Sequence, residues 1–185
     1  YAIAFSSVQM MKNLNFWKKI GETAQPISNI KVSHGTIERG PASATLQFNN
    51  SDIEESPMAH MLEDRFLRKC LNVEIKENTL IDLIEQRKIN EIIDLSKQKQ
   101  LTLDNSSKLQ ASLIVASDGI DSPSAKAFGI RKTGWKYKQH GLVCAVEHEY
   151  SSDNTAYQYF LPEGPLAILP LKRNTASIVW TESIQ

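Results

Sequence analysis

The segment LIVASDGIDSPSAKAFGI, residues 113–130, contains the residues best suited to bind a ligand. Asp118 and Gly119 follow an apolar run at 113–116, which predicts a strand buried on both faces in a parallel layer covered by helices. Ligands of such sheets bind at the carboxyl ends of the strands. Gly119 permits close approach of a ligand to the backbone, and Asp118 offers a carboxylate to ribose hydroxyls. We therefore expect a ligand site at Asp118 and Gly119.

The residues after Asp118 and Gly119 predict a short helix. Ser122 is suited to an N-cap, Pro123 to the first helical position and Gly129 to the far end. A helix amino end beside the carboxyl end of a strand attracts phosphate, because its unpaired N–H groups point outwards. An ordinary strand, turn and helix, with Asp118 as a turn residue, explains the same residues. Both interpretations stay open on the local pattern.

Composition narrows the class of protein. The 185 residues contain 21 basic and 21 acidic side chains, so no net field favours nucleic acid or an anionic membrane. Cys70 and Cys144 lie outside any Cys-x-x-Cys spacing, which indicates reduced thiols and a cytoplasmic protein. No apolar run approaches the roughly 18 residues of a membrane span.

The pattern of apolar residues predicts a mixed order of helices and strands. Helices are expected at 6–20 and 57–71, and strands at 27–32 and 44–48. Three β-rich runs between residues 73 and 103 favour an antiparallel meander. An antiparallel sheet is expected from 156 to 180, with turns at 162–165 and 172–174.

No metal site or catalytic acid, base or nucleophile is predicted. His148 alternates with Glu147 and Glu149, so its side chain points to the opposite face of a strand. His60 and Glu63 lack a second histidine at metal-binding spacing. No Ser/His/Asp or Cys/His arrangement is present.

Two segments carry a resemblance to a known family. ASDGIDSPSAKAFGI resembles the Asp-Gly motif of flavoprotein aromatic hydroxylases with the para-hydroxybenzoate hydroxylase fold. AYQYFLPEGPLAILPLKRNTASIVW resembles the ubiquinone-biosynthesis branch of that family, in particular 2-octaprenyl-6-methoxyphenol hydroxylases. The opening YAIAFSSVQMMKNLNFWKKI and the segment MLEDRFLRKCL are also similar to that family, so the resemblance spans nearly the whole chain.

The resemblance implies an α/β (mixed α+β) fold. Part of a Rossmann-like FAD-binding domain is expected at 1–26 and 58–134. Part of an antiparallel-sheet substrate-binding domain is expected at 27–57 and 135–185. The chain has no Gly-x-Gly-x-x-Gly, so that fingerprint is expected before Tyr1 and a Gly-Asp motif after Gln185. The chain is accordingly expected to be the central fragment of a longer hydroxylase, inactive alone.

The same resemblance implies the site and the reaction. Asp118, Gly119, Ser122 and Arg65 are expected to bind FAD, and Phe160 and Leu169 to line the substrate site. Using NAD(P)H and O2, the enzyme would hydroxylate a polyprenylated phenol in ubiquinone biosynthesis. The flavin would carry the chemistry, which agrees with the lack of a catalytic side chain.

Several alternatives and departures accompany this interpretation. The chain could be a non-catalytic scaffold module, or a hydroxylase of a soluble phenol with the same fold. Because ubiquinone precursors are lipids, peripheral contact with the inner membrane or a ubiquinone-biosynthesis complex is expected as well. Ala125 stands where many relatives carry Arg, and Asp64 where they carry Asn or Gln.

Overall fold

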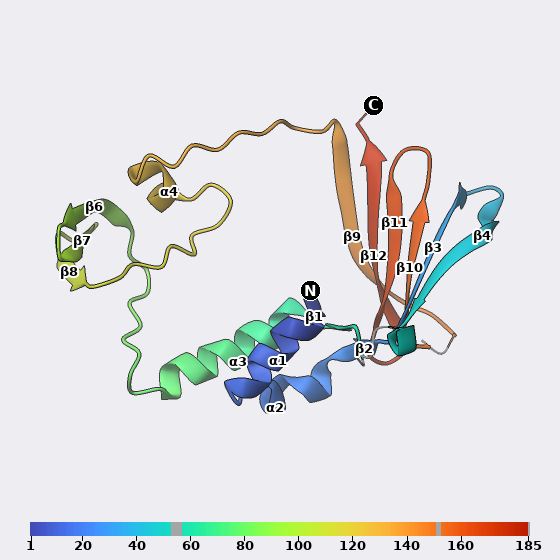
Figure 1. Cartoon of the computed structure of the whole chain (residues 1–185), viewed down its shortest axis with the longest axis horizontal. Coiled ribbons are helices and arrows are strands. Elements are labelled where there is room, and N and C mark those ends of the chain that lie inside the picture. The colour runs from blue at the N-terminus through green and yellow to red at the C-terminus, as the bar shows by residue number, and fades with distance from the viewer. Residues whose placement is uncertain (53–56, 151–152, 185) are drawn as a thin grey trace. The chain divides into compact units, whose positions relative to one another are not determined.

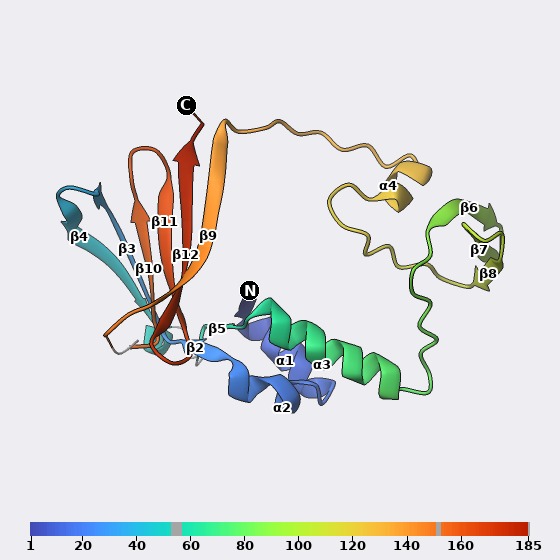
Figure 2. The same ribbon diagram turned by 180° about the vertical axis from the view of Figure 1, so that it is seen from behind.

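The computed structural model describes residues 1–52, 57–150 and 153–184, which form two compact units. The first unit comprises Tyr1–Asn78 and Tyr137–Gln185, and the second comprises Thr79–Lys136. Figures 1 and 2 show the elements from opposite sides. These units group residues by contact, so the FAD-binding and substrate-binding boundaries given above stay predictions.

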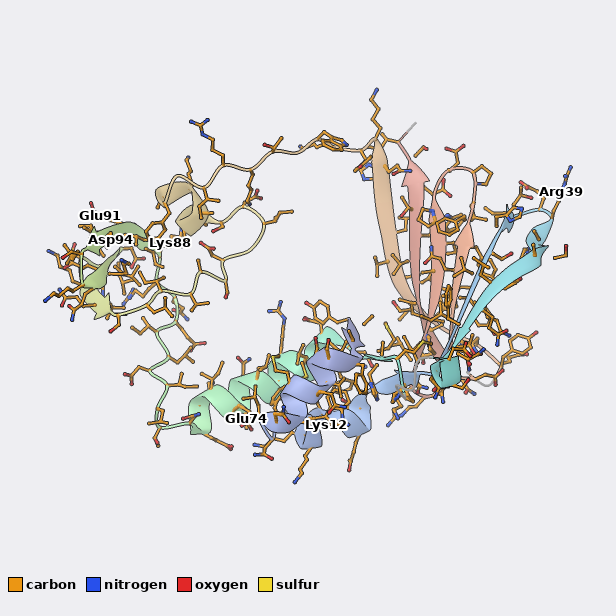
Figure 3. All side chains as sticks on the ribbon, viewed as in Figure 1. Lys12, Arg39, Glu74, Lys88, Glu91 and Asp94 are labelled. Atoms are coloured by element: carbon orange, nitrogen blue, oxygen red, sulfur yellow. The ribbon has the colours of Figure 1, made fainter. Side chains whose placement is uncertain are left out.

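Three helices of the first unit pack around a small core. They are α1 (Phe5–Asn13), α2 (Trp17–Ile20) and α3 (Asp64–Glu77). Their buried residues are Phe16, Ile20, Ala24 and Leu62, with Ile3, Met11 and Phe66 among the partly buried residues around them. Lys19 of α2 forms an ion pair with Glu74 of α3, which is labelled in Figure 3. The apolar core and this surface pair together fix α2 against α3.

A three-stranded sheet lies beside these helices. Its strands are β1 (Ala2–Ala4), β5 (Ala59–Met61) and β2 (Gln25–Ile27), in the order β1-β5-β2. A short helix of three residues, η1 (Gly21–Thr23), connects α2 to β2. Both pairings are antiparallel. Because β5 leads into α3 within three residues, this sheet fixes where α3 begins.

Two expectations for this region need correction. The helix expected at 6–20 is present but breaks between α1 and α2, where Asn15 has a φ of 57°. The helix expected at 57–71 instead begins at Asp64 and continues to Glu77, so the strand expected from residue 73 is wrong. Met61 and Leu62 gave helical spacing because both are buried, at the end of β5 and just after it.

A six-stranded sheet forms the rest of the first unit. Its order is β4 (Gly40–Asn49), β3 (Asn29–Thr36), β10 (Thr155–Phe160), β11 (Pro165–Leu171), β12 (Thr175–Ser183) and β9 (Gln139–Glu147). Between β4 and β5 lies a second short helix, η2 (Asn50–Asp52). Only β3 and β10 pair in parallel among the described strands, and the two hairpins from 156 to 180 are confirmed. The expected antiparallel sheet is therefore largely correct.

The second unit contains a meander that was predicted only in part: the expected strands at INEIIDL and QLTLD are present, but the third strand lies at 108–111 and not at 73–83. It is built from β6 (Ile89–Leu95), β7 (Gln98–Leu103) and β8 (Lys108–Ala111), in the order β6-β7-β8. Lys99 donates to Asp94 across the first hairpin at 2.6 Å, and Figure 3 labels Asp94. The short helix α4 (Pro123–Ala127) follows.

The buried strand expected at 113–116 is wrong for the chain as described. No described strand pairs with these residues, and Leu113 and Val115 are 75% and 78% exposed. A parallel strand is buried only where other strands and covering helices flank it. In the described part of the chain no strand is paired with residues 113–116, so the flanking strands that burial requires are missing there.

Among the described residues, no helix is long and apolar enough to cross a membrane.

Candidate functional site

The turn from Asp118 to Ser124 is organised by one carboxylate. Asp118 accepts a hydrogen bond from the Ser122 hydroxyl at 2.5 Å and another from the Ser124 backbone N–H at 2.9 Å. Ser122 in turn accepts from the Ala125 N–H at 2.9 Å, which confirms Ser122 as the N-cap of α4. Pro123 occupies the first helical position as expected. The capping pattern in the sequence therefore predicted the start of α4 correctly.

Asp118 is ionised at neutral pH. The hydrogen bonds from Ser122 and Ser124 stabilise its charged form and lower its pKa to about 2. Each carboxylate oxygen can accept more than one hydrogen bond, so the two oxygens keep acceptor capacity for a ligand hydroxyl. The turn thus holds a fixed, negatively charged acceptor.

Gly119 leaves its side of this turn open. Its φ is +87°, and a Cβ at this position would meet nothing within 4 Å. Side chains rarely adopt this backbone conformation, so glycine is required for the turn, and the open side lets another molecule reach the backbone. Gly129, with a φ of +68°, follows α4 in the same way.

Two hollows of the second unit border the turn. One of about 490 Å³ lies between β6 and α4 and is lined by Arg87, Lys88, Asp118 and Ser124 among others. The other, of about 410 Å³, is lined by Ser122 and Ala125 and by three cations, Lys126, Arg131 and Lys132. The turn therefore combines an ionised acceptor, an open glycine and nearby positive charge, which suits a ligand with hydroxyl and phosphate groups.

Arg65 lies in the first turn of α3, in the first unit. Its guanidinium forms an ion pair with Glu63 at 2.8 Å and lies 4.8 Å from the centre of the Phe66 ring. The Arg65 side chain is 72% exposed, so it is accessible to a ligand. Asp64 beside it accepts a hydrogen bond from Arg68 at 2.7 Å, so its carboxylate acts as an acceptor within the helix.

Phe160 and Leu169 lie on the same face of the six-stranded sheet. The strand register places Gln158, Phe160, Ala167, Leu169 and Val179 on this face, which we call the shelf. Phe160 is 56% exposed at the end of β10. Leu169 packs against the buried cluster that includes Ile27 and Met61. One end of the shelf is therefore closed by β2 and β5, close to the start of α3 and Arg65.

Tyr157 and Tyr159 lie on the opposite face of the same sheet. The Tyr157 and Tyr159 rings lie 6.4 Å apart and nearly parallel, and they line a hollow of about 400 Å³ with Ile168 and Ile178. Burial raises the pKa of Tyr159. Sequence alternation separates this face from the shelf, but it gave no sign of the hollow, because the hollow depends on strands β9 and β12 as well as β10.

The described residues contain no group of three or more His, Cys, Asp or Glu side chains placed to hold a metal ion. His60 packs edge-on against Trp17, with 4.8 Å between the ring centres. Thus His60 and Glu63 do not form part of such a group.

The fold is that of FAD-dependent monooxygenases. PqsL of Pseudomonas aeruginosa, described as a probable FAD-dependent monooxygenase, superposes with a TM-score of 0.81 at 15% identity, over 98% of this chain and 50% of that one. HpxO of Klebsiella pneumoniae, solved with FAD and uric acid, has a TM-score of 0.75 at 12% identity, over 100% and 47%. The expected fold class is therefore confirmed.

Several sequence relatives are named as hydroxylases or monooxygenases of ubiquinone or its biosynthesis. Ubiquinone hydroxylase UbiL of Rhodospirillum rubrum is 30% identical over 182 residues, which cover 98% of this chain and 41% of the relative. The 3-demethoxyubiquinol 3-hydroxylase of Escherichia coli is 25% identical over 98% of this chain and 45% of its own length. The rat ubiquinone biosynthesis monooxygenase COQ6 is 39% identical over 50% of this chain and 20% of the relative.

The resemblance stated from the sequence is thus confirmed. No family model matches the chain. The chain spans less than half the length of these curated relatives.

Proposed function

We propose that this chain forms part of an FAD-dependent monooxygenase that hydroxylates the ring of a polyprenylated phenol in ubiquinone biosynthesis, using NAD(P)H and O2. The carrying observation is the turn at Asp118, an ionised acceptor beside an open glycine, in a chain that resembles such enzymes along 98% of its length. The relatives' names supply the substrate class, a phenolic ubiquinone precursor.

The residues of the turn fit the ribose and phosphate region of FAD. Asp118 would accept hydrogen bonds from hydroxyl groups, and Gly119 would let the cofactor approach the backbone. Ser122 would hold Asp118 and α4 in place. Arg65 belongs to the first unit, and its contact with FAD is proposed from the sequence resemblance alone. Bound FAD would supply the redox chemistry with oxygen, so these side chains need only bind, orient and exclude water.

The shelf is proposed as the wall of the substrate site. Phe160 offers an exposed aromatic ring, and Leu169 an apolar surface next to β5. Both suit a phenol that carries a hydrocarbon chain, because neither leaves a polar group to desolvate. Peripheral contact with the inner membrane and a ubiquinone-biosynthesis complex follow from the lipid nature of that substrate and stay proposals.

The visible absorption spectrum of the complete gene product, purified without added cofactor, tests the proposal. We expect bound flavin in the wild type, and an Asp118→Ala variant that binds FAD about tenfold more weakly, because an acceptor to hydroxyl groups is lost. Asp82→Ala removes an exposed carboxylate of the same unit and serves as the matched control. Undiminished flavin in Asp118→Ala would contradict the assigned role of Asp118.

The absorption spectrum, followed by hydroxylation assays with soluble and prenylated phenols, separates the alternatives. A folded, colourless wild type that also fails to bind added FAD would favour the scaffold module. A flavoprotein that hydroxylates soluble phenols and ignores prenylated ones would favour the same-fold hydroxylase of a soluble phenol.

A further inference from the structure

The turn between β10 and β11 is bounded and interrupted by prolines. Residues 161–164 connect Phe160 to Pro165, which pair at the end of the hairpin. Pro162 and Pro165 have no N–H, so neither can donate to the strand ladder. Contacts from outside the hairpin supply hydrogen bonds that these two residues cannot donate.

Gly164 provides the first of these contacts. It is buried, and a Cβ at this position would lie 2.5 Å from the Thr181 carbonyl oxygen. The turn thus packs directly on the backbone of β12. Thr181 lies on the shelf face, since it alternates with Val179 along the strand.

Glu163 provides two more contacts. Its carboxylate accepts a hydrogen bond from the Ser183 hydroxyl at 2.6 Å, and its carbonyl oxygen accepts one from the Gln139 side-chain amide at 3.0 Å. Ser183 and Gln139 are directly paired across β12 and β9. Both lie on the shelf face, so the turn is held against that face.

We propose that residues 161–164 form a lip that closes the far end of the shelf, and that Glu163, Ser183 and Gln139 are positioning residues that hold it. The opposite end is closed by β2 and β5, so the lip defines the length of the shelf. Phe160 directly precedes the lip, and the three residues therefore set where its ring lies. This inference rests on the proposed function for its substrate, a prenylated phenol bound on the shelf.

Steady-state hydroxylation by the complete gene product tests the lip. Ser183→Ala removes the hydroxyl that binds Glu163, and we expect KM for the prenylated phenol to rise about threefold with kcat nearly unchanged, the effect of one exposed hydrogen bond. Ser183→Thr keeps the hydroxyl donor, and Glu163→Gln keeps an oxygen that can accept the hydrogen bond. Both variants should therefore have a KM close to that of the wild type. Thr23→Ala is the matched control, because Thr23 lies in η1, outside the six-stranded sheet, and its hydroxyl donates to the Ile20 carbonyl oxygen at 2.7 Å.

Hydrogen exchange of residues 160–166 provides a readout that does not depend on activity. We expect faster exchange there in Ser183→Ala than in the wild type or in Thr23→Ala. Equal exchange in all three proteins would show that the Ser183 hydroxyl does not hold the lip. A KM in Ser183→Ala no higher than in Thr23→Ala would overturn the role of the lip in substrate binding. An inactive wild type with the expected exchange pattern would contradict the proposed function and the substrate role, while supporting the hydrogen bond that holds the lip.

Discussion

Asp118 owes its low pKa to hydrogen bonds from neighbours in the turn, and the first is the Ser122 hydroxyl. We expect carboxyl NMR to give a pKa of about 2 in the wild type and a value closer to 3.8 in Ser122→Ala. Since the folded-state pKa is lowered, the stabilisation from Asp118 is present above 3.8 and is lost as the pH falls through about 2. Ser107→Ala removes a hydroxyl from another turn of the same unit and should leave Asp118 unchanged. An unaltered Asp118 titration in Ser122→Ala would refute this assignment.

Gly164 and Gly141 differ in the space beside them. A Cβ on Gly164 would lie 2.5 Å from the Thr181 oxygen, whereas one on Gly141, which pairs with Thr181, would meet nothing within 4 Å. Urea denaturation should show Gly164→Ala about 2 kcal/mol less stable than the wild type, because β12 must move. Gly141→Ala should stay within about 0.5 kcal/mol. Equal stability of the two variants would show that the lip does not pack on β12.

At the residue scale, local chemistry was predictable and distant contacts were not. Ser122, Pro123 and Gly129 follow from capping preferences that act over a few residues. The bond from Ser183 to Glu163 joins residues 20 positions apart and depends on the pairing of three strands. No local pattern contains that information.

The strand β5 contains His60, whose lowered pKa makes the folded chain more stable at neutral pH than at acidic pH. Burial lowers the pKa of His60 from 6.5, and the charges of Lys12 and Lys172 lower it further. The unfolded chain therefore binds a proton that the folded chain does not, and stability should decrease as the pH falls from 6.5 towards the folded-state pKa. Urea midpoints measured across this range should fall less steeply in His60→Gln, which cannot titrate there.

A second variant separates burial from charge at His60. Lys12→Met removes one nearby positive charge, so the pKa of His60 should rise slightly and the pH slope should become shallower than in the wild type. Identical slopes in the wild type and in His60→Gln would mean that another group controls the acid response.

At the scale of elements, hairpins were more predictable than helix boundaries. The hairpin of β6 and β7 and the hairpins of β10, β11 and β12 have alternating patterns with turn residues between them, whereas β8 was not predicted. The start of α3 was misplaced because Met61 and Leu62 are buried for different reasons, one in a strand and one against α2. Periodicity alone does not separate these cases.

At the scale of the whole chain, apolar residues are divided between a real core and an exposed run. Leu62 is 0% exposed and Val115 is 78% exposed, although both are apolar residues in patterns that predict burial. The sequence predicted burial for both residues. At 113–116 it contains the pattern of a buried strand, but the neighbours that would cover this strand are missing from the described part of the chain. Burial of that run depends on partners that no residue in the run specifies.

The comparison of Leu62 and Val115 makes this difference measurable. Leu62→Ala should lower the free energy of unfolding of the 185-residue chain by about 2–5 kcal/mol, because it leaves a cavity among Phe16, Ile20 and Ala24. Val115→Ala should change it by less than about 0.5 kcal/mol, as expected of an exposed side chain. Both values come from urea denaturation followed by circular dichroism. A loss in Val115→Ala as large as in Leu62→Ala would show that residues 113–116 are buried after all, as their sequence pattern predicts.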